Sequence, residues 1–104
     1  MRFSELHFPE APNIVVEPPG PKSKQLLEKQ KKIESKAVLY PLAVPLTLEA
    51  ARGATVKDVD GNTYIDFFGG IAVLNVGHSN PTVLKAVREQ EGKLIHALDF
   101  PTTP

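Results

Sequence analysis

Residues 58–81, DVDGNTYIDFFGGIAVLNVGHSNP, hold the side chains most able to do chemistry, because aspartates, glycines and a histidine gather in one short span. A calcium loop counted from Asp58 would need a glycine at its sixth position and a glutamate at its twelfth. Thr63 and Gly69 hold those positions. GHSNP departs from a nucleophile elbow at Pro81, and the glycines of GGIAVLNVG lack the spacing of a dinucleotide loop. The span therefore predicts tight turns rather than a calcium, phosphate or nucleophile site.

The histidines do not predict a metal site, because His7, His78 and His96 lie in different segments and no two have the spacing of metal ligands. Asp58 and Asp66 could form an acid–base pair, but aspartates on hairpin strands more often cap turns or pair with lysine. We therefore assign no catalytic residue and no metal ligand. We interpret His78 as a residue that fixes the loop before the last helix.

The segment Gly69-Gly70-Ile71-Ala72 is the most informative part of the span. Two glycines after an aromatic strand permit the backbone to approach a ligand or another chain closely. The apolar residues that follow could form the wall of a small pocket. From these residues alone, a packed corner of the fold explains the segment equally well.

Composition sets the class of protein. The chain has 104 residues, of which 41% are hydrophobic and 23% charged, as expected of one small globular domain. Twelve basic and twelve acidic residues cancel, so the net charge gives no reason to expect a nucleic-acid or membrane partner. There is no cysteine and no continuous apolar run of membrane-spanning length. We therefore expect a soluble, cytoplasmic protein.

The first part of the sequence predicts an extended arm and then a helix. Prolines recur through residues 1–22, which favours an extended N-terminal arm. From Ser23, the expected N-cap, apolar residues follow at helical spacing until Tyr40-Pro41, where the proline ends the helix. Glutamates are interspersed among the lysines on the rest of this helix, which indicates a solvated face rather than a phosphate-binding patch.

The middle of the sequence predicts three short strands. Residues 45–51, 54–59 and 62–68 are rich in Thr, Val, Ile, Tyr and Phe and are separated by turn-forming dipeptides. The second dipeptide, Asp60-Gly61, suits a two-residue hairpin turn. These strands are expected to form an antiparallel meander.

One face of this meander should be packed against other residues and the other face exposed to solvent. Val56 and Tyr64 are expected on the packed face, and Lys57 and Thr63 on the face that meets water. Residues 79–98 open with Ser-Asn-Pro and continue at helical spacing, so they predict an amphipathic helix that covers the sheet. The expected fold class is α+β, with an arm, a helix, the meander and this second helix in order.

Residues 54–96, ATVKDVDGNTYIDFFGGIAVLNVGHSNPTVLKAVREQEGKLIH, resemble the N-terminal part of class III pyridoxal-phosphate aminotransferases, the family of 4-aminobutyrate, ornithine and acetylornithine aminotransferases. The similarity covers 46–96 and consists of an aromatic-bounded hairpin, a G-I-A-V turn, G-H-x-x-P and an amphipathic helix, in that order. PGPKSKQLLEKQ, YPL and HALDF are also similar to archaeal members, which include 4-aminobutyrate aminotransferases and amino-acid racemases.

The resemblance implies a type I pyridoxal-phosphate (PLP) transferase fold. Residues 23–104 would then form the N-terminal part of the small domain, truncated before the large PLP-binding domain. It also implies that Ile71 and Gly70, together with Ala72, bind the substrate.

In this family the Schiff-base lysine, the acid that faces the pyridine nitrogen and the phosphate cradle all come from the large domain. Lys85 and Lys93 lie outside the family's Schiff-base motif, so no cofactor-binding residue is assigned and PLP is not expected to bind this chain alone. The resemblance implies a homodimeric enzyme that moves an amino group from an amino acid like 4-aminobutyrate to a 2-oxo acid such as 2-oxoglutarate. This chain alone would not be active.

Two alternatives stay open at this point. The first is a segment of a PLP-dependent amino-acid racemase on the same scaffold, because the residues that separate the two reactions are not in this sequence. The second is a truncated, non-enzymatic docking fragment, which the extended DFPTTP segment and the exposed edges of a three-stranded meander favour.

Overall fold

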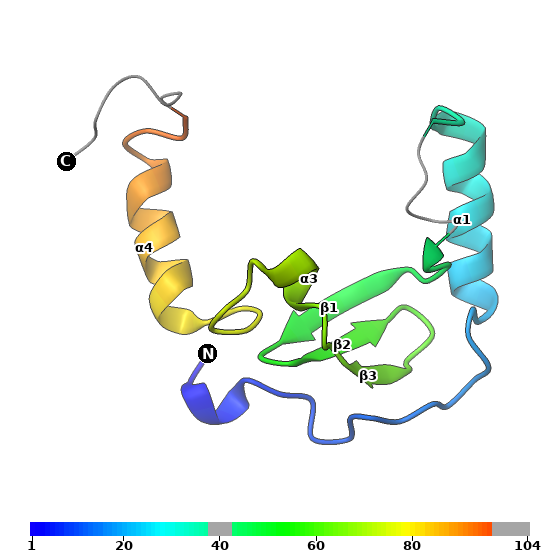
Figure 1. The fold of residues 1–104 in the computed structure, drawn as a ribbon, viewed down its shortest axis with the longest axis horizontal. Helices are drawn as coiled ribbons and strands as arrows, with labels where there is room; N and C mark the ends of the chain where they lie inside the picture. The colour runs from blue at the N-terminus through cyan, green and yellow to red at the C-terminus, as the bar shows by residue number, and fades with distance from the viewer. Residues whose placement is uncertain (38–42, 97–104) are drawn as a thin grey trace.

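The computed structural model describes residues 1–37 and 43–96 and confirms the α+β class (Figure 1). Within these ranges, no helix has the length and apolar character needed to cross a bilayer. Along the chain the elements are η1 (Phe3–Glu5), α1 (Pro21–Ile33), β1 (Leu48–Arg52), β2 (Thr55–Asp58), β3 (Thr63–Ile65), α3 (Gly69–Ala72) and α4 (Pro81–Glu91).

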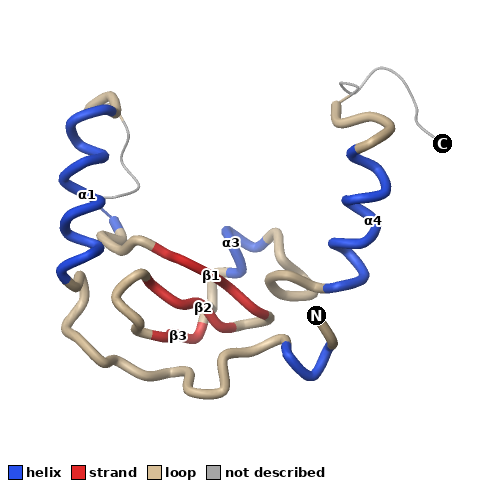
Figure 2. The backbone as a smooth tube through the Cα atoms, turned by 180° about the vertical axis from the view of Figure 1, so that it is seen from behind, coloured by secondary structure: helices blue, strands red, loops and turns tan. Residues whose placement is uncertain are grey.

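The three strands form the antiparallel meander that the sequence predicts. β2 lies between β1 and β3 (Figure 2). Val56 pairs with Ala51 on one side and Tyr64 on the other. The pairing of β1 with β2 is irregular between Leu48 and Ala50. Val56 is buried, as expected of the packed face of the sheet.

The turn between β2 and β3 is wider than the predicted two-residue turn. Of Asp60 and Gly61, only Gly61 has a positive φ, 93°, and the backbone N–H of Asp58 donates to the carbonyl of Asn62 at 3.0 Å. The reason lies in the Asp58 carboxylate, whose Oδ1 accepts from the N–H groups of Asp60 and Asn62, each at 2.9 Å. A side chain therefore organises this turn, and two positive φ angles are not needed.

Asp58 is the centre of a buried polar network. Its second oxygen accepts from Nδ2 of Asn62 at 2.9 Å and from the Tyr64 hydroxyl at 2.7 Å, and Asp58 itself has no exposed surface. Burial acts to raise the pKa of Asp58, but the hydrogen bonds from Tyr64 and Asn62 outweigh it and lower that pKa. Burial and the neighbouring Asp58 raise the pKa of Tyr64 to about 12. The network thus holds a charged carboxylate opposite a neutral phenol.

The N-terminal arm runs along the β3 side of the sheet (Figures 1 and 2). Asn62 Oδ1 accepts from the N–H groups of Val15 and Val16 at 2.8 and 2.9 Å. Asn13 exchanges two backbone hydrogen bonds with Thr63, at 2.9 and 2.8 Å. Thr63 is fully buried as a result, so the prediction that it faces water is wrong: the arm covers the strand edge at that point.

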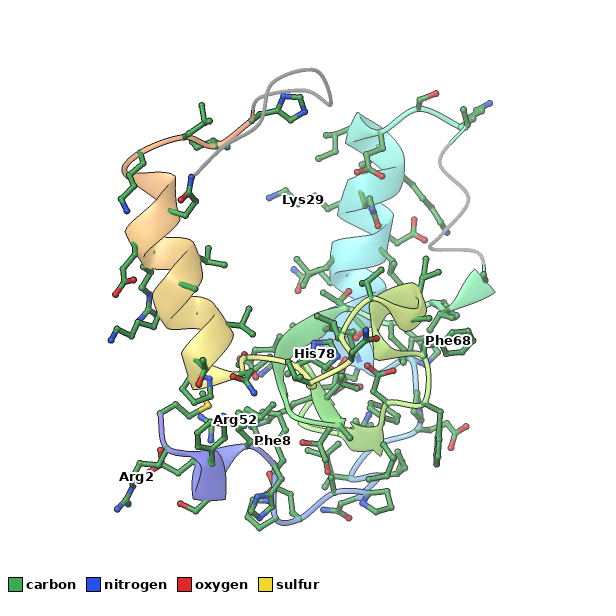
Figure 3. All side chains as sticks on the ribbon, turned by 60° about the vertical axis from the view of Figure 1, so that its left-hand side comes forward. Arg2, Phe8, Lys29, Arg52, Phe68 and His78 are labelled. Atoms are coloured by element: carbon green, nitrogen blue, oxygen red, sulfur yellow. The ribbon has the colours of Figure 1, made fainter. Side chains whose placement is uncertain are left out.

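The start of the arm is held by a second group of contacts. The Arg52 guanidinium lies over the Phe8 ring, 5.1 Å from its centroid (Figure 3). The Phe8 N–H donates to Thr55 Oγ1 at 2.9 Å. The end of β1 and the start of β2 therefore also take part in holding the arm.

α1 is capped by a residue far away in the sequence. Asp60 accepts from the N–H groups of Lys22 and Ser23 at 2.8 and 2.9 Å, across 38 and 37 residues. The predicted N-cap Ser23 is instead a buried residue of the first helical turn, and Gly20, directly before the helix, is the N-cap. The helix ends at Ile33, ahead of the boundary predicted at 40–41, which lies outside the described residues.

α4 begins as the sequence predicts but is shorter. Asn80 is its N-cap, and its Oδ1 accepts from the N–H groups of Thr82 and Val83 at 3.0 and 3.3 Å. A proline fills the first helical position. The helix ends at Glu91 with glycine as its C-cap, so it covers only part of the predicted range 79–98.

The prediction that this helix covers the sheet is wrong. α4 leads away from the sheet (Figure 1). Val83 and Val87 on its apolar face are exposed. Val56 is the only apolar side chain that is buried within the described ranges. The accessible surface of 8199 Å² exceeds the roughly 5,700 Å² of a compact monomer of this mass. Apolar periodicity predicts a face to be buried, but in α4 that face has no described residues of the sheet against it.

Candidate functional site

Residues Gly69–Ala72, labelled α3, form a left-handed turn. The φ angles of Gly69, Gly70, Ile71 and Ala72 are 54°, 64°, 74° and 56°. The ψ angles of Gly70 and Ile71, 33° and 54°, complete left-handed geometry. Glycine adopts this geometry freely, but a β-branched isoleucine does so rarely and at a cost of about 1–3 kcal/mol. The surrounding structure must therefore hold Ile71 in place.

The loop that carries this turn is apolar, uncharged and exposed. Residues 67–77 contain no charged side chain. Ile71 is 83% exposed, and Phe67 and Phe68 are exposed beside it. Figure 3 shows Phe68 pointing outward from the loop. The described residues therefore present an apolar surface without covering it.

Asp66 holds the start of this loop. Its Oδ1 accepts from the N–H groups of Phe68 and Gly69 at 2.9 and 3.0 Å, and its Oδ2 lies 2.6 Å from Nε2 of His78. A carboxylate accepts, so Nε2 of His78 is the donor. The hydrogen bond from His78 lowers the pKa of Asp66, the two backbone N–H groups add to the effect, and burial opposes it. Asp66 is thus stabilised as an anion at the neck of the loop.

The two ends of the loop rest on the turn between β1 and β2. The Asp66 N–H donates to the Ala54 carbonyl at 2.8 Å. His78 and Gly53 exchange two backbone hydrogen bonds, at 2.9 and 2.8 Å. Gly77 is packed so closely on Gly53 that a Cβ at position 77 would lie 2.8 Å from the Gly53 Cα. The interpretation of His78 as the residue that fixes this loop is confirmed.

We expect acid to loosen the turn. The pKa of Asp66 in the folded chain lies below its ordinary value of 3.8, so its contribution is complete above pH 3.8 and disappears as the pH falls through the lowered value. Amide hydrogen exchange measures the loosening of the turn, provided that protection is expressed relative to the exchange rate of the unfolded chain at each pH. Protection of the Phe68 and Gly69 amides should fall on acidification. The Thr82 amide is the control, because its acceptor Asn80 does not titrate.

The structure brings the three predicted site residues together and separates the two aspartates considered as an acid–base pair. Gly70, Ile71 and Ala72 share one exposed turn. Asp66 bonds His78, whereas Asp58 bonds Asn62 and Tyr64. Both aspartates organise turns, as the sequence favoured. The pairing of Asp66 with His78 was not predicted, because its spacing of 12 residues matches no local motif.

The family is now established by comparison. The family model described as "Aminotransferase class-III" matches residues 40–103 of this chain. The chain belongs to the class III aminotransferases. It is 40% identical over 94 residues to an alanine/serine racemase of Pyrococcus horikoshii, covering 90% of this chain and 20% of that protein. It is 60% identical over 52 residues to a 5-aminovalerate aminotransferase of Pseudomonas aeruginosa, covering 50% of this chain and 12% of the relative.

Solved structures agree with this assignment. An acetylornithine aminotransferase from Elizabethkingia anophelis superimposes with a TM-score of 0.62 at 30% identity, covering 78% of this chain and 21% of that one. An ornithine δ-aminotransferase from Plasmodium falciparum gives a TM-score of 0.64 at 25% identity, covering 77% of this chain and 20% of its own. The class III chain thus spans about a fifth of the length of such relatives.

The described residues of this class III segment do not themselves fit PLP. A covalent site needs a lysine in a protected position, but none of the lysines in the described ranges is buried. Lys85 is exposed and lies 3.9 Å from Glu89 on its own helix. The buried carboxylate of Asp58 already accepts hydrogen bonds at both oxygens. We therefore derive no reaction step through the cofactor from these residues.

Proposed function

We propose that this chain is the N-terminal segment of a PLP-dependent aminotransferase, part of its small domain. The enzyme would move an amino group from an amino acid like 4-aminobutyrate to a 2-oxo acid such as 2-oxoglutarate. This segment alone would neither bind PLP nor transfer the amino group. Below, "the complete enzyme" means this segment together with the remaining part of such a protein, as a cytoplasmic homodimer.

The left-handed turn at Gly69–Ala72 is the observation that carries the proposal. A strained β-branched residue persists only where its surroundings hold it, and such residues cluster at functional sites. Here both ends of the loop are tied to Gly53 and Ala54, while Ile71 itself is 83% exposed. The loop thus holds the turn in a geometry that exposes the apolar side chain of Ile71.

The chemistry of the loop indicates which part of the substrate it contacts. Because residues 67–77 carry no charge, they cannot neutralise a carboxylate or an ammonium group. They suit the methylene chain of an ω-amino acid, whose burial contributes about 0.8 kcal/mol for each CH₂. Ile71 would position that chain and exclude water from it. Bound PLP would supply the electron sink for the reaction, through residues outside this segment.

A racemase is the second candidate, and one observation favours it. A relative that aligns over 90% of this chain is an alanine/serine racemase. A racemase inverts the amino acid without a 2-oxo acid, whereas an aminotransferase consumes one equivalent of it. Product analysis of the complete enzyme with and without 2-oxoglutarate separates the two reactions.

The test of the turn is Ile71→Ala in the complete enzyme. Loss of an apolar wall should lower kcat/KM for 4-aminobutyrate about 10-fold, mostly through KM, since one lost apolar contact is worth roughly 1–3 kcal/mol. Steady-state kinetics with 4-aminobutyrate measures this. Ile33→Ala, which changes an exposed isoleucine at the end of α1, is the matched control and should leave kcat/KM unchanged. Equal values for the Ile71 variant and the unsubstituted enzyme would refute a substrate-facing role for the turn.

A further inference from the structure

The loop that carries Ile71 is held by polar contacts at its neck. Phe67, Phe68, Ile71, Val73 and Val76 are all exposed, so apolar packing within the described residues contributes little to fixing the loop. Inside the loop, the backbone N–H groups of Ala72, Val73 and Leu74 donate to the carbonyls of Phe68 and Gly69. At its neck, the side chains of Asp66 and His78 bond each other. Asp66 bonds two N–H groups immediately before the turn and reaches across the neck to His78.

The position of this pair ties together the two ends of the loop that carries the strained turn. Asp66 is the first residue after β3, and His78 is the residue that returns the loop to the sheet through Gly53. The side-chain bond between Asp66 and His78 joins two positions 12 residues apart and so closes the loop. Backbone hydrogen bonds from Asp66 to Ala54 and between His78 and Gly53 fix the same two ends. Their side chains are only 13% and 21% exposed, so solvent competes weakly for the bond.

We propose that Asp66 and His78 form a positioning pair that holds the Ile71 turn in its substrate-facing geometry. The proposal rests on the proposed function of that turn. Neither residue needs to touch the substrate. Asp66 orders the N–H groups of Phe68 and Gly69, and His78 keeps the Asp66 carboxylate aimed at them. Through the turn, the pair sets how well the enzyme binds the aliphatic part of the amino donor.

Four variants of the complete enzyme test the pair. Asp66→Ala and His78→Ala remove one partner each. His78→Gln is the conservative variant, because its amide nitrogen can donate in place of Nε2. Asp66→Ala combined with Ile71→Ala forms a double-mutant cycle with the two single variants. If one aspartate variant fails to fold, the two His78 variants still give the comparison.

Two readouts are expected to move together. Amide exchange at Phe68 and Gly69 should accelerate at least about 10-fold in both alanine variants, since each loses a charge-assisted hydrogen bond. The kcat/KM for 4-aminobutyrate should fall about 10-fold, mainly through KM, and His78→Gln should restore both values. Because the pair acts through the turn, adding Ile71→Ala to Asp66→Ala should cost little more.

The outcomes distinguish this inference from the proposed function. If Ile71→Ala lowers kcat/KM but the alanine variants leave both readouts unchanged, the pair does not position the turn. Fully additive losses in the double variant would likewise overturn it. If exchange accelerates while neither Ile71→Ala nor Asp66→Ala changes donor kinetics, the proposed function of the turn is wrong, and with it the pair's effect on the substrate.

Discussion

Replacing Asp58 by alanine should lower the free energy of local unfolding around the hairpin by about 3–4 kcal/mol. Asp58 has no exposed surface and accepts from the N–H groups of Asp60 and Asn62, from Asn62 Nδ2 and from the Tyr64 hydroxyl. Each donor left buried without an acceptor costs about 1–3 kcal/mol, and the costs are not additive. The substitution also removes the group that shapes the turn, so it should release the arm and α1 as well.

Native-state amide exchange measures this loss, because a large enzyme does not unfold in one step. The Asn13 and Thr63 amides, which pair the arm with β3, should lose protection together. Tyr64→Phe removes one donor and should cost about 1 kcal/mol. Glu49→Ala, at an exposed carboxylate on β1, is the matched control and should change little. Retained protection at Asn13 in the Asp58 variant would show that the arm does not depend on this network.

The second large effect is expected from Gly77→Ala. At φ 79°, alanine pays a conformational cost of about 1–2 kcal/mol, and its Cβ would lie 2.8 Å from the Gly53 Cα and 3.0 Å from the Gly53 carbonyl atoms. These are backbone atoms, which cannot rotate away. The neck of the loop should therefore open, at a total cost of about 3 kcal/mol.

The effect of Gly77→Ala should appear in structure and in kinetics. The Gly53 and His78 amides, which bond each other's carbonyls, should exchange faster, and kcat/KM for 4-aminobutyrate should fall at least about 10-fold in the complete enzyme. Gly92→Ala is the matched control, because a Cβ there meets no atom within 4 Å and the residue has a negative φ. Equal protection of the Gly53 amide in the two variants would contradict the close packing at the neck.

Local chemistry was enough to predict several elements. The strand order follows from β-rich segments separated by glycine turns, and the start of α4 follows from Asn80 and the proline after it. Gly70, Ile71 and Ala72 are predicted as site residues from the glycine pair and the family resemblance, and that role stays a prediction. Their left-handed backbone was not predicted, since isoleucine disfavours that geometry and so gives no signal for it.

Long-range contacts account for what the sequence did not predict. Asp60 caps a helix whose first turn lies 37 and 38 residues earlier, and Asn62 binds the arm across a similar separation. Both lie in the span that the sequence predicts to form tight turns. Alternation along the strand predicted that Thr63 meets water. The prediction failed because alternation carries no information about an arm that covers the strand. The Asp66–His78 bond is of the same kind, because it depends on the path of the loop between them.

The exposed apolar face of α4 shows what hydrophobic spacing alone cannot predict. Its spacing predicts correctly that Val83 and Val87 share a face, but spacing does not say which surface covers that face. In this segment the sheet does not cover it. An apolar pattern therefore identified the helix and gave the wrong partner.

We propose that this segment contributes the Ile71 wall to an enzyme that transfers amino groups. The transfer of ¹⁵N from labelled 4-aminobutyrate to 2-oxoglutarate by the complete enzyme, with isoleucine or alanine at position 71, tests this proposal. We predict ¹⁵N-glutamate in an amount equal to the 2-oxoglutarate consumed, and about 10-fold less efficient transfer by the Ile71→Ala variant. Transfer that is unaffected by Ile71→Ala, or inversion of an α-amino acid with no 2-oxoglutarate consumed, would contradict the claim.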